Sequence, residues 1–353
     1  MAKILMKGNE AIGAAAIKGG CKYFFGYPIT PQNELPEYMS RELQKAGGCF
    51  VQAESEVAAI NMVYGASGAG ARVMTSSSSP GIALKQEGIS YIAAAELPCV
   101  IVNISRGGPG LGGIQPSQSD YFQSTRGGGN GDYRLLVYAP ATLQEAVDLT
   151  MEAFDIADFY RNPVMVVGDG MIGQMMEPVE FKEMPKRKLP PKDWASVGTN
   201  GERKPNIINS LALDPQVLEN HNKDLQKKYA VMEENEVRYE TYNMENAQAV
   251  IVAYGTTSRI AKNAIVALKE EGIEVGLIRP ITLWPFPMKA FDEVPATAKA
   301  LLSVEMSEGQ MIDDVKIASN GRFPVYFYGR SGGMIPTPHA VVDKIKEILG
   351  GVK

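Results

Sequence analysis

The chain has 353 residues, a formal net charge of -5, and 45% hydrophobic and 21% charged residues, a composition typical of an ordinary globular protein. This length predicts two compact domains instead of one core. The charge disfavours a nucleic-acid partner, and the sequence shows neither a signal-peptide pattern nor an apolar run of about 18 residues, so we expect a cytoplasmic protein without membrane contact.

The first half alternates short β-like runs with helical stretches. The expected strands are residues 50–52, 72–75, 100–104, 135–138 and 164–167. The expected helices are residues 56–67, 81–95 and 143–160. This alternation predicts an α/β fold in which helices cover both faces of a parallel sheet. Ligands of such folds meet the loops that follow the carboxyl ends of the strands.

The pattern dissolves between residues 177 and 245, where prolines recur and a charged, exposed helix is expected near 214–239. A strand at 249–254, a helix to 271 and a strand at 274–278 then predict a βαβ unit. We therefore expect a first domain at 1–190, a linker with a charged helix at 191–246, and a smaller α/β domain at 247–353.

Four segments in the first half combine rigid turns, hydroxyls, acids and glycines. They are Gly26-Tyr27-Pro28-Ile29-Thr30-Pro31, residues 52–59 (QAESEVAA), residues 75–81 (TSSSSPG) and residues 105–110 (SRGGPG). In this order and spacing they resemble the pyrimidine-binding, alpha-type subunit of 2-oxoacid:ferredoxin oxidoreductases. The resemblance continues through residues 115–122 (QPSQSDYF). The forms PQNE at 31–34 and AESE at 53–56 look like the branched-chain subclass, which acts on 3-methyl-2-oxobutanoate (2-oxoisovalerate).

The resemblance implies a thiamine pyrimidine-binding parallel-sheet domain followed by a transketolase-C-terminal-like domain. The implied reaction is the CoA-dependent oxidative decarboxylation of 3-methyl-2-oxobutanoate to acyl-CoA and CO2, with reduction of ferredoxin. Thiamine diphosphate would be shared with a beta-type subunit. The other implied partners are an iron–sulfur ferredoxin-like subunit, a gamma-type subunit, ferredoxin and coenzyme A. A 2-oxoglutarate:ferredoxin oxidoreductase subunit and a noncatalytic assembly subunit remain alternatives.

Metal-binding residue types are scarce in this chain. Its three cysteines form no C-x-x-C pair, and it has two histidines. An iron–sulfur cluster usually needs more thiolates than three scattered cysteines supply, so we expect the clusters on partner subunits. Gly168-Asp169-Gly170 and Asn200 approach the spacing of a thiamine-enzyme magnesium motif, but a Pro- and Lys-rich segment separates them. We expect a turn there and no metal site, with Mg²⁺ held by a partner.

Glu56 is the candidate catalytic residue. Thiamine diphosphate is activated when N1' of its pyrimidine exchanges a proton with a carboxylic acid, and Glu56 precedes a run of small and apolar residues that suits such an acid. Glu54 competes, but two residues apart the pair cannot both face one site. The resemblance selects Glu56. The structural alternative is an acid that stabilises the dipole at a helix start.

The remaining candidate residues take their roles from the resemblance. Thr30 and Arg106 would contact the substrate carboxylate; the alternatives are a local cap for Thr30 and a surface ion pair for Arg106. Ser78 belongs to a loop that would border the cofactor or form a plain turn. Tyr27, Pro28 and Ile29 would line the pyrimidine pocket. Residues 330–333 (RSGG) form a turn or touch a phosphate of coenzyme A.

Overall fold

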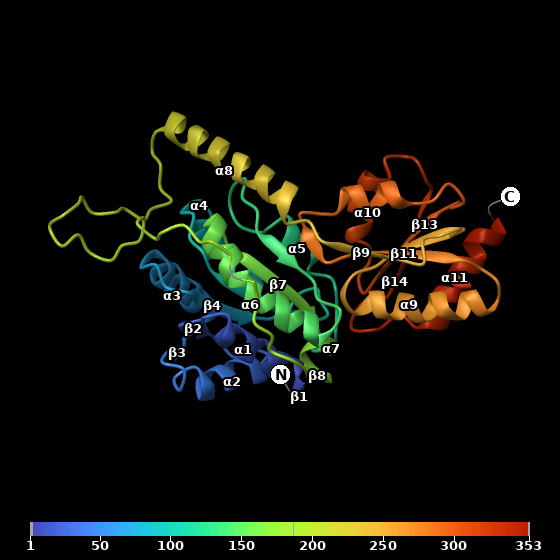
Figure 1. Ribbon diagram of the computed structural model, residues 1–353, viewed down its shortest axis with the longest axis horizontal. Coiled ribbons are helices and arrows are strands. Elements are labelled where there is room, and N and C mark those ends of the chain that lie inside the picture. The colour runs from blue at the N-terminus through green and yellow to red at the C-terminus, as the bar shows by residue number, and fades with distance from the viewer. Residues whose placement is uncertain (1–2, 186, 352–353) are drawn as a thin grey trace.

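The computed structural model describes residues 3–185 and 187–351, which form two sheets with helices on their faces (Figure 1). The larger sheet has the strand order β12-β6-β7-β5-β4-β2-β3. All pairs are parallel except that of β12 with β6. Its strands are β2 (Tyr23–Gly26), β3 (Cys49–Gln52), β4 (Val73–Ser77), β5 (Val100–Ser105), β6 (Leu136–Tyr138), β7 (Val164–Asp169) and β12 (Thr282–Trp284).

Two groups of helices flank this sheet, as the alternating sequence pattern predicts (Figure 1). One group is α1 (Gly8–Lys18), α2 (Glu34–Glu42) and α6 (Leu143–Tyr160); the other is α3 (Glu56–Gly68) and α4 (Ser79–Ala94). The chain runs outward from β2 to β3 and then returns past β2 to β4. The order therefore reverses beside β2, and a crevice is expected there at the carboxyl ends of the strands.

Short elements complete the first domain. They are the antiparallel pair β1 (Ile4–Lys7) and β8 (Met176–Val179), and the helices α5 (Tyr121–Thr125) and α7 (Gly170–Gln174).

The smaller sheet has the order β14-β13-β10-β11-β9 and is parallel except for β9. The predicted βαβ unit is confirmed, because β10 pairs in parallel with β11 through α9. Helices α9 and α11 pack together, and α10 packs with η1. The elements are β9 (Tyr239–Tyr242), β10 (Ala249–Val252), α9 (Gly255–Glu270), β11 (Val275–Pro280), η1 (Met288–Glu293), β13 (Leu301–Glu305), α10 (Met311–Ser319), β14 (Val325–Gly329) and α11 (Pro338–Gly351).

Helix α8 (Pro215–Asn235) lies along the first domain, and the segment before it projects from the body (Figure 1). The sequence predicted an exposed helix here, and this prediction is wrong for one side of α8. Leu225, Tyr229 and Met232 are buried and belong to the main core, because their spacing places them on one side of the helix. Most of its charged residues are exposed, whereas Lys228 is largely buried and pairs with Glu96.

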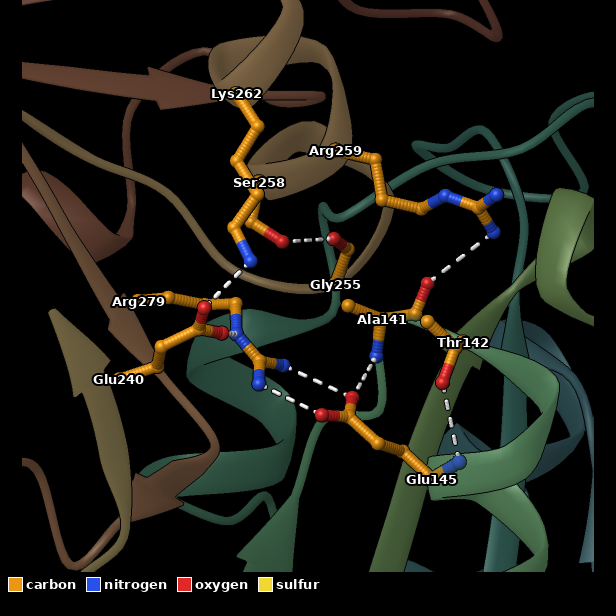
Figure 2. Close-up of polar contacts among 9 residues, drawn as sticks. All are labelled: Ala141, Thr142, Glu145, Glu240, Gly255, Ser258, Arg259, Lys262 and Arg279. Atoms are coloured by element: carbon orange, nitrogen blue, oxygen red, sulfur yellow. Dashed lines mark hydrogen bonds and ion pairs between the residues drawn. The ribbon is translucent and has the colours of Figure 1, made fainter. Parts of the chain in front are cut away.

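The two domains are joined by a polar network around Arg279 of β11 (Figure 2). Its Nη1 and Nη2 donate to the two carboxylate oxygens of Glu145 in α6 at 2.9 and 2.6 Å, and its Nε donates to Glu240 in β9 at 2.7 Å. Lys262 donates to the same Glu240 at 2.6 Å, while the backbone N–H of Ala141 donates to Glu145 at 2.8 Å. A helix of one domain is thereby tied to two strands of the other.

No helix within the described ranges combines the length and the apolar character that crossing a membrane would require.

Candidate cofactor site

Four loops meet at the carboxyl edge of the larger sheet, beside the point where the strand order reverses. They follow β2, β3, β4 and β5, and they contain the four segments that the sequence singles out. Because these strands are parallel neighbours, their following loops lie along one edge. The edge therefore gathers Thr30, Glu56, Ser78 and Arg106 from distant parts of the chain.

The loop after β2 is held by its backbone carbonyls. Arg106 Nη1 donates to the Thr30 carbonyl at 2.8 Å, and Asn9 and Gln174 donate to the Pro31 carbonyl at 2.8 and 3.0 Å. Gln32 is fully buried and accepts a hydrogen bond from Ser76 Oγ at 2.6 Å. The turn thus owes its fixed shape to side chains from elsewhere in the chain as well as to its prolines. Tyr27, Pro28 and Thr30 are exposed and Ile29 is half-buried, which leaves their side chains available to a ligand.

Glu56 is the first residue of α3, after Ser55, whose side chain accepts a hydrogen bond from the N–H of Ala58 at 3.1 Å. The Glu56 side chain is buried, whereas Glu54 is exposed. The carboxylate lies against Gly81 in α4, where an added Cβ would come within 2.7 Å of Glu56 Oε1 and 2.1 Å of Ser77 Oγ. Only glycine leaves the space that this carboxylate occupies.

Several buried polar atoms at this edge lack a hydrogen-bond partner within the described residues. They are the hydroxyls of Ser77 and Ser78 and the Nε of Arg106. Buried polar groups nearly always have a partner, so such a concentration is typical of a ligand site. Together with the carboxylate beside Gly81, these atoms fit the pyrimidine half of thiamine diphosphate.

Arg106 directly follows β5 and is 6% exposed. Its Nη2 donates to the Leu111 carbonyl at 2.9 Å, in addition to the bond from Nη1 to Thr30. The guanidinium is therefore fixed between two loops, and it is no surface ion-pair residue. Nε has no hydrogen-bond partner among the described residues, so its N–H can donate to a carboxylate.

Asp120 is a buried carboxylate next to this edge. Its Oδ2 accepts hydrogen bonds from Ser79 Oγ at 2.6 Å and from Asn103 Nδ2 at 2.8 Å. Burial raises the pKa of Asp120, although these hydrogen bonds and Arg106 oppose the shift. Ser79 Oγ also accepts a hydrogen bond from the N–H of Arg106 at 2.9 Å. Asp120 thereby helps to hold the backbone that carries Arg106.

Lys85 lies inside the same region. It is fully buried on α4, and its Nζ donates to Thr75 Oγ1 at 2.7 Å and to the Ser76 carbonyl at 3.0 Å. Burial lowers the pKa of Lys85 to about 7, and the charge of Glu56 acts in the opposite direction. The environment of Glu56 is therefore not only small and apolar, as the sequence suggests, but also contains a buried amine.

The Gly168-Asp169-Gly170 segment is a strand-to-helix junction. Asp169 ends β7, and its Oδ1 accepts hydrogen bonds from the N–H groups of Met171 and Ile172 at 2.8 and 3.3 Å, so it caps α7. Across the parts of the chain that the structure describes, no three His, Cys, Asp or Glu side chains are grouped as metal ligands would be.

A cleft of about 650 Å³ lies beside the site, between the two domains. Residues of the first domain (Ser79, Leu84 and Asp120) and of the second (Glu308, Ser331 and Gly332) line it. Part of the 330–333 turn thus borders a space that opens toward Asp120.

Gln118 fixes the two walls of this cleft. Its N–H donates to the Met306 carbonyl at 2.8 Å, its Nε2 donates to the Tyr254 carbonyl at 2.9 Å, and its Oε1 accepts from the Met306 N–H at 3.0 Å. The QPSQSDYF segment therefore serves both the site, through Asp120, and the joint between the domains.

Sequence reasoning missed the structural roles of Lys85, Asp120 and Gln32. Asp120 and Gln32 stand within the segments that carry the resemblance, which was the available signal. Lys85 has no such signal, because nothing in its local sequence distinguishes it from a lysine on an exposed helix face.

Two family models match the chain. One, described as "Pyruvate flavodoxin/ferredoxin oxidoreductase, thiamine diP-bdg", matches residues 14–245. The other, "Pyruvate:ferredoxin oxidoreductase core domain II", matches residues 247–341.

Full-length relatives are similar as well. The chain is 51% identical to ketoisovalerate oxidoreductase subunit VorB of Methanothermobacter marburgensis, with 99% of each chain covered. It is 37% identical to 2-oxoglutarate synthase subunit KorA of Methanocaldococcus jannaschii, with 94% of this chain and 96% of the relative covered.

Among solved structures, the 2-oxoglutarate:ferredoxin oxidoreductase from Magnetococcus marinus, with 2-oxoglutarate, coenzyme A and succinyl-CoA bound, has a TM-score of 0.86 at 28% identity. The similarity covers 99% of this chain and 65% of that one. A split-gene transketolase has a TM-score of 0.62 at 15% identity, which is a similarity of fold alone.

Proposed function

This chain belongs to the pyruvate flavodoxin/ferredoxin oxidoreductase family, and from that premise we propose that it presents Glu56 to thiamine diphosphate in a 2-oxoacid:ferredoxin oxidoreductase. The observation that carries the proposal is the buried Glu56 carboxylate against Gly81, near the Ser77 hydroxyl, which like that of Ser78 has no hydrogen-bond partner among the described residues. The chain is an alpha-type subunit, and the enzyme is a heteromeric complex.

The proposed reaction converts 3-methyl-2-oxobutanoate and coenzyme A into acyl-CoA and CO2, and its electron pair passes to ferredoxin. This substrate is supported by the greater similarity to relatives named for ketoisovalerate than to those named for 2-oxoglutarate. When bound, thiamine diphosphate supplies the chemistry that cleaves the bond to the substrate carboxylate. A beta-type subunit would hold its diphosphate and Mg²⁺, and an iron–sulfur subunit, with a gamma-type subunit, would carry the electrons. We expect this complex to act in the cytoplasm.

The residues of this chain would bind, orient and exchange protons. Glu56 would hold and return the proton at N1' of the pyrimidine, and the rim formed by Tyr27, Pro28, Ile29 and Ser78 would surround that ring. Arg106 would meet the substrate carboxylate with its Nε–H, and Thr30, whose carbonyl Arg106 already holds, would contact the same group.

The test is Glu56→Gln in the complex reconstituted with its partners. We expect ferredoxin reduction to fall at least about 100-fold because the amide cannot exchange the proton, whereas binding of thiamine diphosphate persists. Glu54→Gln is a matched control, since Glu54 is exposed two residues earlier; its turnover should stay within about twofold of wild type. Near-normal turnover of Glu56→Gln would refute the proposal.

The substrate assignment is tested separately by kcat/KM. We expect 3-methyl-2-oxobutanoate to be preferred over 2-oxoglutarate by at least about tenfold, because one apolar group in a matching pocket contributes about 1–3 kcal/mol. Equal or better use of 2-oxoglutarate would move the chain to the other subclass and leave the role of Glu56 intact.

A further inference from the structure

Lys85 is a buried amine that the proposed reaction does not use. Its side chain is inaccessible to solvent, and its contacts are the neutral oxygens Thr75 Oγ1 and Ser76 O. No carboxylate of the described ranges lies within ion-pair distance of its Nζ. Lysines are rarely buried without a charged partner, because removing an ammonium from water is costly.

Its placement relates it to Glu56. Gly81 and Lys85 are four residues apart on α4 and therefore lie on one side of the helix. The Glu56 carboxylate packs against Gly81, one turn from Lys85. Among the titratable groups of the described residues, Glu56 is the one whose charge acts on Lys85. The oxygens that hold Lys85 belong to β4, just before the hydroxyls of Ser77 and Ser78, for which the described part of the chain offers no hydrogen-bond partner.

A packing role does not account for this lysine. Methionine would fill a similar volume without a buried charge, and replacing buried charges by apolar residues is often neutral or stabilising. An amine retained beside a proposed catalytic acid is typical of a group that adjusts that acid.

We propose that Lys85 is a positioning residue for Glu56, whose buried ammonium favours the ionised carboxylate and so favours the proton on the thiamine pyrimidine. The inference rests on the proposed function of Glu56. The coupling is electrostatic and needs no proton transfer between the two side chains. When Lys85 loses its proton, its positive charge disappears, and Glu56 activates thiamine diphosphate less strongly.

The first experiment measures unfolding of the full chain without cofactor at a series of pH values. The pKa of Lys85 falls from 10.5 in the unfolded chain to about 7 in the folded chain, so the unfolded chain binds the extra proton between these values. The contribution of Lys85 to the free energy of unfolding should therefore rise with pH across that window, and the difference between wild type and Lys85→Met isolates it. Lys85→Met should lack this rise and should be at least as stable as wild type below pH 7.

Lys228→Met is the matched control. Lys228 on α8 is also largely buried with a lowered pKa caused by burial, but it pairs with Glu96 at 3.1 Å. This variant should retain the rise that Lys85 causes. Adding Glu56→Gln to Lys85→Met should give a change in stability that differs from the sum of the single changes, because the two groups interact.

The second experiment compares kcat of the reconstituted complexes. Below pH 7, Lys85→Met should be about tenfold slower than wild type, because it lacks the buried positive charge beside Glu56. The two rates should converge at alkaline pH, where wild-type Lys85 is neutral, and the KM for the 2-oxoacid should change less than about twofold. Lys228→Met should follow the wild-type profile.

Three outcomes distinguish the inference from the proposed function. If Glu56→Gln is slow but Lys85→Met keeps the wild-type pH profile, the inference is wrong and the role of Glu56 stands. A destabilised Lys85→Met with additive behaviour toward Glu56→Gln would also overturn it. If Glu56→Gln turns over normally, the proposed function itself is wrong, whatever interaction the stabilities of the single and double variants show.

Discussion

At the carboxyl edge of the larger sheet, several buried residues are polar, whereas the buried residues of a strand are usually apolar. Thr75, Ser76 and Ser77 are buried in β4, and the charged groups of Glu56 and Lys85 are buried beside them. Burying such groups costs free energy unless partners compensate, so the edge is less stable than an apolar core would be. A ligand that supplies the missing partners would stabilise the folded chain by mass action.

Gly81→Ala tests how closely this residue-level packing controls Glu56. The added Cβ would clash with Ser77 Oγ and Glu56 Oε1, so the carboxylate must move. We expect turnover of the reconstituted complex to fall by about tenfold or more, since displacing a catalytic group by ~1 Å can cost 100-fold. Gly65→Ala is the control: Gly65 lies in α3 with open space around its Cα, so the variant should gain up to about 1 kcal/mol in stability and keep its turnover.

At the level of elements, local patterns predicted β3 to β7, β10, β11 and the helices α3, α4, α6, α8 and α9, but not β1, β2, β8, β9, β13 or β14. The fully buried run Val100–Ser105 and the long helix Leu143–Tyr160 appear at the expected places because their signals lie within the segment. β12 escaped prediction because it has three residues and depends on pairing with a strand far away in the sequence. The buried side of α8 was not predicted, because its few apolar residues are surrounded by charged residues in the sequence.

The site was predictable to a different degree. Three of its loops were identified because they follow expected parallel strands, and all four carried the family resemblance, whereas β2 before residues 26–31 was not predicted. Burial of Lys85 could not be predicted, since it results from the packing of α4 on β4 and not from the sequence around it. Sequence shows which residues are present, while their solvation depends on tertiary structure.

At the level of the whole molecule, the domains act as one body because polar contacts and a shared core cross between them. Tyr254, Ile278 and Met311 of the second domain belong to the same buried cluster as the strands of the first. Gln118 and Arg279 add hydrogen bonds at two separate places on the joint. These contacts join the two parts of the chain that line the cleft beside the site.

Arg279→Met should weaken this joint. It removes the cation between Glu145 and Glu240, so Glu145 loses its ion pair across the interface while Glu240 retains Lys262. We expect a loss of about 1–3 kcal/mol in the free energy of unfolding, less than the ~3–5 kcal/mol for fully buried pairs because both carboxylates are partly solvated. Lys227→Met, which breaks an exposed pair with Asp224, should change stability by less than about 0.5 kcal/mol. Similar losses in the two variants, measured by denaturant unfolding, would contradict a structural role for Arg279.

The position of β12 in the chain determines when the larger sheet can be completed during translation. This strand covers the free edge of β6, yet it is encoded between β11 and η1 of the second domain. A nascent chain that has completed β6 and β7 still presents an uncovered strand edge until residues 282–284 leave the ribosome. Uncovered strand edges pair readily with other chains, so the first domain cannot reach its protected state as an independent cotranslational unit. Maturation of the larger sheet therefore waits for the translation of a segment that belongs, by position in the chain, to its neighbour.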